Sequence, residues 1–409
     1  MNKPRSLTRN VAFVSTCAFL IGCGRTDSPP PGSGDASGAS AARQITAAPA
    51  QNTTLVPLAV AKTLNSEAEY EKGAALAADG KLDEARLVFQ AAAGANPQHS
   101  SLAAVVAIYR DVDEGRVTRD AIHRMFRAMH HANAGRWADA HADADEAVKL
   151  APAYVRAHDT SAQVFLLQGK HEDAIKGFNR VLAIDSKFAQ GYYNRGATYA
   201  YMGRHDAAIA DYTRAIELQP SFSDAYCNRG SAYTFKNDVQ AAMADYAKAH
   251  ELDPHAVEPI YLRGVLFALL RQWNEAVADF TRAIERDPDH AESYYDRGVS
   301  YQNQGNDDRA LADFAKAIEL NPANPAALIN RGLILMRRKG YDPAISDFDK
   351  ALSLAPAMVV AQYNKALALD QSGRAKEAVA AYRTFLPQAT PEHAALAKHA
   401  RERLTMLEK

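Results

Sequence analysis

The sequence contains little cysteine and has almost no net charge. Its 409 residues include three cysteines, and 47 lysines and arginines nearly balance 48 aspartates and glutamates, for a formal net charge of −1. Cys17 and Cys23 belong to the N-terminal region treated below, which leaves Cys227 alone and excludes a disulfide framework. Nucleic-acid binding requires a basic face, so this charge balance gives no reason to expect a nucleic-acid partner.

The sequence also lacks the motifs of common enzymes. It contains no metalloprotease helix motif, no nucleophile elbow and no Walker loop. Asp111, Asp113 and Glu114 form an acidic group, but the remaining ligands of a calcium loop are missing. Once the segments described below are assigned, only residues 100–120 remain, which are too few for a catalytic domain. We therefore expect a protein without enzymatic activity, cofactor, metal or small-molecule substrate.

A period of 34 residues runs through most of the chain. Proline and glycine recur at this interval in the registers of Pro220 and Gly196. Alanine recurs eight times, at Ala140, Ala174, Ala208, Ala242, Ala276, Ala310, Ala344 and Ala378. Three registers with one period indicate an array of similar small modules, which presents an extended surface and usually binds other molecules.

Each module has the pattern of a helical hairpin. In one of them, residues 189–201 and 206–218 both show helical periodicity, and Pro220 ends the second helix. Gly196 and Ala208 are small, which allows the backbones of the two helices to approach closely. A single hairpin cannot bury its apolar face, so neighbouring modules must stack.

This spacing resembles the tetratricopeptide repeat (TPR). The matching residues of one module are Gly196, Tyr199, Ala208, Tyr212, Ala215 and Pro220. The resemblance implies an all-α fold, a right-handed superhelical solenoid of stacked antiparallel helix hairpins. We expect a first TPR-like hairpin plus an extra helix at 58–112, a hinge at 113–120, eight consecutive TPR units at 121–392 and a C-terminal capping helix at 393–409.

One position departs from the family pattern. The residue before the glycine is normally apolar, but here it is usually arginine, and an aspartate follows 16 residues later. The pairs are Arg127 with Asp143, Arg195 with Asp211, Arg229 with Asp245, Arg263 with Asp279, Arg297 with Asp313, and Arg331 with Asp347. Repeats that lack the arginine also lack the aspartate, as in Lys365 with Ala381. We predict a structural ion pair within each hairpin and not between neighbours; the alternative is a row of arginines that binds an acidic ligand.

The first helices of the hairpins suggest a binding face. Asparagines recur there at Asn194, Asn228, Asn330 and Asn364, beside Tyr193, Tyr261, Tyr295 and Leu262. An amide can donate to and accept from a peptide backbone at once. The row resembles the asparagine ladder with which some TPR superhelices hold extended peptides on their concave face. The alternative is that the asparagines satisfy local polar groups and the tyrosines pack.

The N-terminal region resembles that of a bacterial lipoprotein. Basic residues precede a short apolar stretch at 11–21, which is too short to span a bilayer and is typical of an export signal. Leu20-Ile21-Gly22-Cys23 resembles a lipobox, which implies a signal peptide at 1–22 and lipidation, including palmitate, at Cys23. Residues 23–57 have the composition of a disordered tether. The alternative is ordinary cleavage, which would release a soluble periplasmic protein.

Together these features predict a membrane-anchored adaptor. The resemblances imply a location in the bacterial cell envelope, with the lipid anchor in the outer membrane and the repeats facing the periplasm. The expected partner is a protein or peptide that is recruited to, or assembled into, an envelope complex. Two alternatives remain, namely a chaperone-like carrier of exported unfolded chains and a regulatory subunit of a cell-wall enzyme.

Overall fold

The computed structural model describes residues 66–95 and 100–409, and within these ranges all regular secondary structure is helical. The predicted signal peptide, Cys23 and the predicted tether lie outside the described residues. The chain forms two compact parts, an N-terminal part up to residue 266 and a C-terminal part from residue 267 onward, with residues 285–287 grouped with the first. No described helix is long and apolar enough to cross a membrane.

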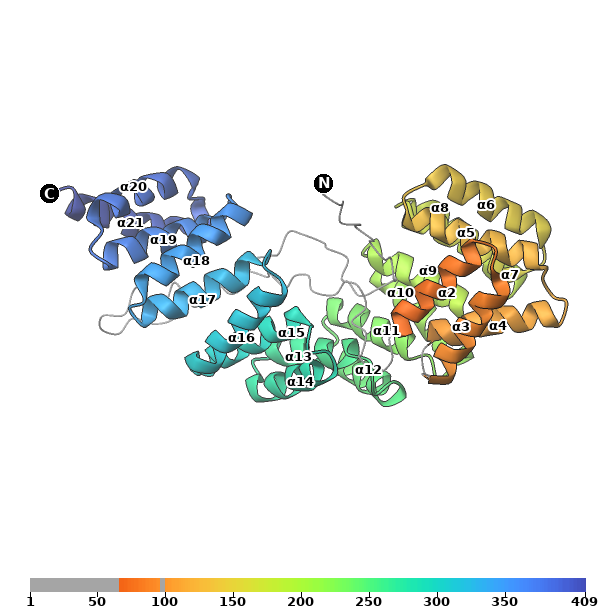
Figure 1. Ribbon diagram of the computed structural model, residues 1–409. Helices are drawn as coiled ribbons and strands as arrows, with labels where there is room; N and C mark the ends of the chain where they lie inside the picture. Colours follow the sequence, from red (N-terminus) through yellow and green to blue (C-terminus); the bar gives the residue numbers. More distant parts are fainter. Residues whose placement is uncertain (1–65, 96–99) are drawn as a thin grey trace. The chain divides into compact units, whose positions relative to one another are not determined.

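The N-terminal part consists of helices joined by short turns (Figure 1). They are α2 (Ser66–Ala78), α3 (Leu82–Ala95), α4 (Ser100–Asp113), α5 (Arg119–Asn133), α6 (Trp137–Leu150), α7 (Val155–Leu167), α8 (His171–Ile184), α9 (Ala189–Tyr201), α10 (His205–Leu218), α11 (Ser223–Phe235), α12 (Val239–Leu252) and most of α13 (Glu258–Leu269). From α5 to α12, each first helix packs on its own second helix, which packs on the next first helix.

The C-terminal part repeats this arrangement. Its helices are α14 (Trp273–Arg286), α15 (Ala291–Asn303), α16 (Asp307–Leu320), α17 (Pro325–Arg337), α18 (Tyr341–Leu354), α19 (Val359–Gln371), α20 (Ala375–Phe385) and α21 (Ala394–Leu407). Two short 3-10 turns, Leu386–Gln388 and Pro391–His393, separate α20 from α21. The all-α array of antiparallel hairpins predicted from the 34-residue period is confirmed.

Helix α21 closes the C-terminal part. It packs against α20 and buries one apolar side, which includes Leu396 and Ala400. Arg403 donates from Nε and Nη2 to the two oxygens of Asp370, at 2.7 and 2.8 Å, which ties α21 to α19. These hydrogen bonds lower the pKa of Asp370. The apolar end of the last hairpin is therefore covered, as solubility of a repeat array requires.

Residues 100–120 change how the first hairpin packs. Helix α4 packs on α3, and α5 packs on α2, whereas other first helices pack mainly on the second helix before them. Leu102, Phe89 and Ile122 share one buried cluster at this junction. A tight turn that contains Gly115 connects α4 to α5, and Thr118 accepts a hydrogen bond from the Ala121 amide at the start of α5. The insertion is thus part of the apolar core; the role of 113–120 as a hinge stays a prediction.

Small residues set the separation of the helices in each hairpin. A Cβ atom added at Gly196 would lie 3.1 Å from the ring of Tyr212, and Gly298 and Gly332 face Phe314 and Phe348 in the same way. The hairpin of α7 and α8 exchanges the two positions. Here the first helix has Ala162 and the second helix has the small residue, Gly177, whose added Cβ would lie 2.7 Å from the Cβ of Ala162.

Replacing Gly177 with alanine is expected to destabilise the protein by about 1–3 kcal/mol because it overpacks this crossing. Helix propensity alone predicts the opposite, a gain of about 1 kcal/mol. Adding Ala162→Gly should recover much of the loss, since the double variant has the arrangement of the other hairpins. Urea unfolding measures both effects. Gly94→Ala is the control because nothing lies within 4 Å of its added Cβ; a stabilising Gly177→Ala would contradict the packing argument.

Candidate partner-binding surface

Arginine–aspartate pairs join the two helices of the hairpins. Arg195 donates from Nε and Nη2 to the two oxygens of Asp211, both at 2.7 Å. Arg229 with Asp245, Arg297 with Asp313, and Arg331 with Asp347 repeat this bidentate geometry at 2.6–2.8 Å. All four aspartates are buried. Such geometry gives strong, directional hydrogen bonds, so these pairs fix how the two helices pack.

The two remaining pairs differ. Asp143 lies 3.1 Å from Arg127 Nε and 2.6 Å from Arg124 Nη1, so two arginines share one carboxylate. Asp279 accepts from Arg282 Nη1 at 2.9 Å, one turn further along α14. A contact between Arg263 and Asp279 stays a prediction.

The arginines also reach the preceding hairpin, which corrects the expectation that pairing is confined to one hairpin. Arg195 Nη1 donates to Asn179 Oδ1 at 2.6 Å, and Arg229 and Arg297 donate to Thr213 and Thr281 at 3.1 Å. The reason is geometric, because the guanidinium lies between two successive second helices and carries donors on both sides. Lys365, which has no aspartate in its own hairpin, contacts Asp349 of the preceding one at 2.6 Å.

Aromatic rings complete the surroundings of these arginines. The Arg229 guanidinium carbon lies 5.5 Å from the ring centroid of Tyr226 and 5.9 Å from that of Tyr233. The hydrogen bonds to Asp245 raise the pKa of Arg229. With donors engaged by two helices and its faces against rings, this guanidinium has little capacity left for a ligand. The contacts therefore favour the structural interpretation over a row of arginines that binds an acidic ligand.

The asparagine row lies inside the stack. All four asparagines are buried, as are Tyr193, Tyr261 and Leu262, while Tyr295 is half-buried. Asn228 Nδ2 donates to the Tyr193 hydroxyl at 2.9 Å, and Asn330 Nδ2 donates to the Tyr295 hydroxyl at 3.3 Å. These bonds connect successive first helices. Burial and internal bonding favour the alternative that these side chains satisfy local polar groups, and peptide binding by the row stays a prediction.

Asn194 has a different partner, which the sequence analysis missed. Its Nδ2 donates to Oδ1 of Asp159 at 3.0 Å, and Gln163 Nε2 donates to Oδ2 of the same carboxylate at 2.7 Å. Asp159 is buried between α7 and α9, and burial raises its pKa to about 6 despite these two hydrogen bonds. An ionisable group thus lies at the contact between two hairpins.

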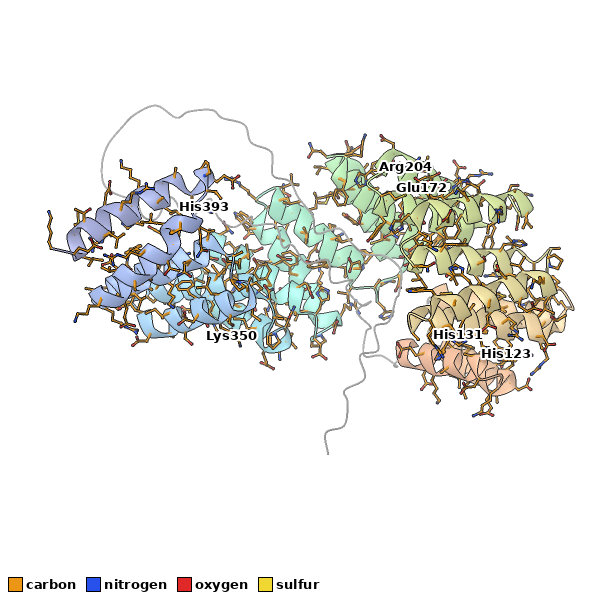
Figure 2. All side chains as sticks on the ribbon, turned by 90° about the horizontal axis from the view of Figure 1, so that it is seen from above. His123, His131, Glu172, Arg204, Lys350 and His393 are labelled. Atoms are coloured by element: carbon orange, nitrogen blue, oxygen red, sulfur yellow. The ribbon has the colours of Figure 1, made fainter. Side chains whose placement is uncertain are left out.

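Exposed ion pairs follow the turns at one edge of the hairpins. Arg204 Nη1 lies 3.5 Å from Glu172 of the preceding hairpin, and Figure 2 shows the two side chains next to one another. Lys236 with Asp206, Arg337 with Asp307, and Arg374 with Asp342 make similar contacts at 2.7–3.4 Å. Because they are solvated, each contributes little to stability. Among the described residues, no group of histidine, cysteine and acidic side chains could bind a metal ion.

The geometry defines a stack of helical hairpins built to present surface, and comparison with known families agrees. Models described as tetratricopeptide repeat match residues 189–222, residues 223–255, and residues 39–100, 261–325, 295–359 and 329–394. A model described as TPR repeat matches residues 162–203. These matches cover most of the chain, which therefore belongs to the tetratricopeptide repeat family. No curated protein matches it significantly.

Several solved structures are similar to the chain. YrrB, described as a TPR protein with an unusual peptide-binding site, is 26% identical over 46% of this chain and 97% of its own, with a TM-score of 0.39. A tetratricopeptide repeat protein from Parabacteroides merdae is 21% identical over 62% and 100%, with a TM-score of 0.47. The Cut9–Hcn1 hetero-tetramer of APC/C is 15% identical over 75% and 64%, with a TM-score of 0.51. The last likeness supports the fold alone.

Proposed function

We propose that this protein is a membrane-anchored adaptor of the bacterial cell envelope that binds a protein or peptide partner. Membership of the TPR family supports a role in protein interaction. The observation that carries the finer proposal is the sequence Leu20-Ile21-Gly22-Cys23, which ends an apolar stretch and precedes a polar, proline- and glycine-rich segment. Lipidation at Cys23 would attach the chain to the membrane with more than one acyl group, which is enough for stable anchoring.

The segment after Cys23 gives the repeats room to move relative to the membrane. Residues 24–57 behave by composition as a flexible coil, and a coil of this length has an r.m.s. reach of roughly 30 Å. The repeats would then lie near the outer membrane on its periplasmic side, and would recruit a partner to an envelope complex there.

Replacing Cys23 with serine is expected to move essentially all of the protein from the membrane fraction to the soluble fraction, because the acyl attachment site is lost. Fractionation of cells that express the full chain, followed by immunoblotting, measures this. Cys227→Ser is the matched control, since Cys227 is a buried side chain of α11 outside the anchor. A Cys23→Ser variant that stays in membranes after a salt wash would overturn the proposed anchor.

Chemical crosslinking in the same cells tests the adaptor role. The proposal predicts one enriched partner, which is found in membranes with the wild type and in the soluble fraction with Cys23→Ser. A diffuse set of exported chains would favour a carrier of unfolded chains instead. A partner enzyme whose rate changes when the purified repeats are added would favour a regulatory subunit.

A further inference from the structure

The extra helix α4 forms one wall of a pocket that sequence reasoning did not find. The pocket has a volume of about 420 Å³ and lies where α4 meets the start of α7 and the turn between α8 and α9. Its lining includes Arg110, Arg116, Tyr154, Arg156, Ile184 and Phe188. All of these residues belong to the N-terminal part of the chain. The pocket therefore depends on the 100–120 insertion, which interrupts the repeat period.

The acidic residue of the pocket is already paired. Asp111 is buried, accepts a hydrogen bond from the Tyr154 hydroxyl at 2.8 Å, and accepts a second from Arg116 Nη1 at 2.6 Å. Burial and this hydrogen bond raise the pKa of Tyr154, so its hydroxyl remains a neutral donor. The carboxylate thus connects α4 to α7, and its charge is compensated within the protein.

Two other guanidinium groups keep unused donors. Arg156 lies 5.4 Å from the ring centroid of Phe188, and its Nε is 4.0 Å from an oxygen of Asp111, beyond hydrogen-bond distance. Neither Arg156 nor the exposed Arg110 donates a side-chain hydrogen bond to any residue that the structure describes. The second acidic lining residue, Asp185, accepts from the Lys187 amide in its own turn. The pocket therefore has spare positive charge and spare donors.

We propose that this pocket binds a carboxylate of an acidic peptide segment from the partner protein. Arg110 and Arg156 would donate paired N–H groups to the carboxylate, a geometry for which the planar guanidinium is suited. Val155, Ile184 and Phe188 supply an apolar wall for a neighbouring side chain of the peptide. The inference rests on the proposed adaptor function, because the ligand is part of a partner protein.

The position of the pocket distinguishes it from the asparagine row. The row is buried and bonded internally, whereas Arg110 is exposed and Arg156 is half-buried with its guanidinium donors unused. An acidic peptide is favoured over nucleic acid because the whole chain has a net charge of −1 and an isolated basic pocket cannot follow a phosphate backbone.

Three synthetic pentapeptides test the proposal with the full chain in detergent. The first carries two glutamates and an amidated C-terminus, the second has glutamines in their place and a free C-terminal carboxylate, and the third has glutamines and an amidated C-terminus. Isothermal titration calorimetry should show binding of the first or second peptide, and that result identifies the source of the carboxylate. The neutral third peptide should bind at least about tenfold more weakly, as expected when charge-assisted hydrogen bonds are lost.

The pocket residues are tested with Arg110→Gln/Arg156→Gln, which should weaken binding of the carboxylate peptide by about tenfold or more. Arg180→Gln is the matched control, because it removes one exposed charge from α8 outside the pocket and should leave binding unchanged. The single variant Arg110→Gln changes only an exposed side chain and should fold normally, and it should show part of the loss. Equal binding of the neutral peptide, unchanged binding in both pocket variants, or no binding by the wild type would overturn the proposal.

The crosslinking experiment described above separates this inference from the proposed function. A partner captured equally by the wild type and by Arg110→Gln/Arg156→Gln overturns the pocket assignment and leaves the adaptor function standing. If the wild type captures no partner at all, the adaptor function itself fails.

Discussion

Replacing Asp245 with alanine should destabilise the hairpin of α11 and α12 by about 3–5 kcal/mol, the range expected when one partner of a buried ion pair is removed. The Asp245 residue is 5% exposed and the Arg229 side chain 16% exposed. Without the carboxylate, Arg229 keeps only Thr213 and the flanking tyrosine rings as neighbours. The guanidinium would then be a poorly compensated buried charge, which accounts for the size of the effect.

Hydrogen exchange with mass spectrometry is the appropriate measurement because repeat arrays can unfold in parts, so a single midpoint does not describe them. Faster exchange should appear first in α11 and α12 and in α10, whose Thr213 shares the arginine. Asp206→Ala is the matched control. It removes the exposed pair with Lys236, in which the aspartate side chain is 82% exposed, and should cost less than about 1 kcal/mol. Equal effects from the two variants would show that the buried pairs do not join the hairpins.

The contact between α7 and α9 is expected to be stronger at pH 5 than at pH 7. Burial raises the pKa of Asp159 to about 6 in the folded protein, above the unfolded value of 3.8. Its contribution is therefore fully present below pH 3.8 and is lost as the pH rises through 6, because the charged form must then be buried. Two pKa units correspond to about 3 kcal/mol.

Asp159→Asn should abolish this pH dependence. The comparison is the difference in local exchange of α7 and α9 between wild type and variant from pH 4 to pH 7, after correction for intrinsic exchange. A difference is needed because other carboxylates act in the opposite sense. Asp370, whose pKa is lowered by Arg403, contributes stability that is lost as the pH falls. An identical pH profile in wild type and variant would contradict the assignment of Asp159.

Much of the fold could be predicted because the period fixes it. The 34-residue spacing locates the helices, and the joint presence or absence of arginine and aspartate indicated the ion pairs. The second arginine contact was missed although it left a signal, since Asn179, Thr213 and Thr281 occupy one register of the same period. The exchange of Ala162 and Gly177 was likewise readable in sequence, but only the packed hairpin shows that the two positions meet.

The pocket and the buried aspartates could not be predicted in this way. Asp111 meets Tyr154 across 43 residues, and this contact depends on how α4 packs outside the repeat period. The asparagine row illustrates the reverse problem. Its spacing matches a ligand-binding pattern, but whether an amide faces solvent or the neighbouring helix depends on packing that periodicity does not determine.

Native mass spectrometry of the complex extracted from membranes in mild detergent tests the adaptor proposal most directly. The account predicts one dominant species whose mass equals the chain beginning at Cys23, with its acyl groups, plus a partner at a fixed stoichiometry. A chain that is found only alone and without acyl groups, or with a heterogeneous set of partners, would contradict it.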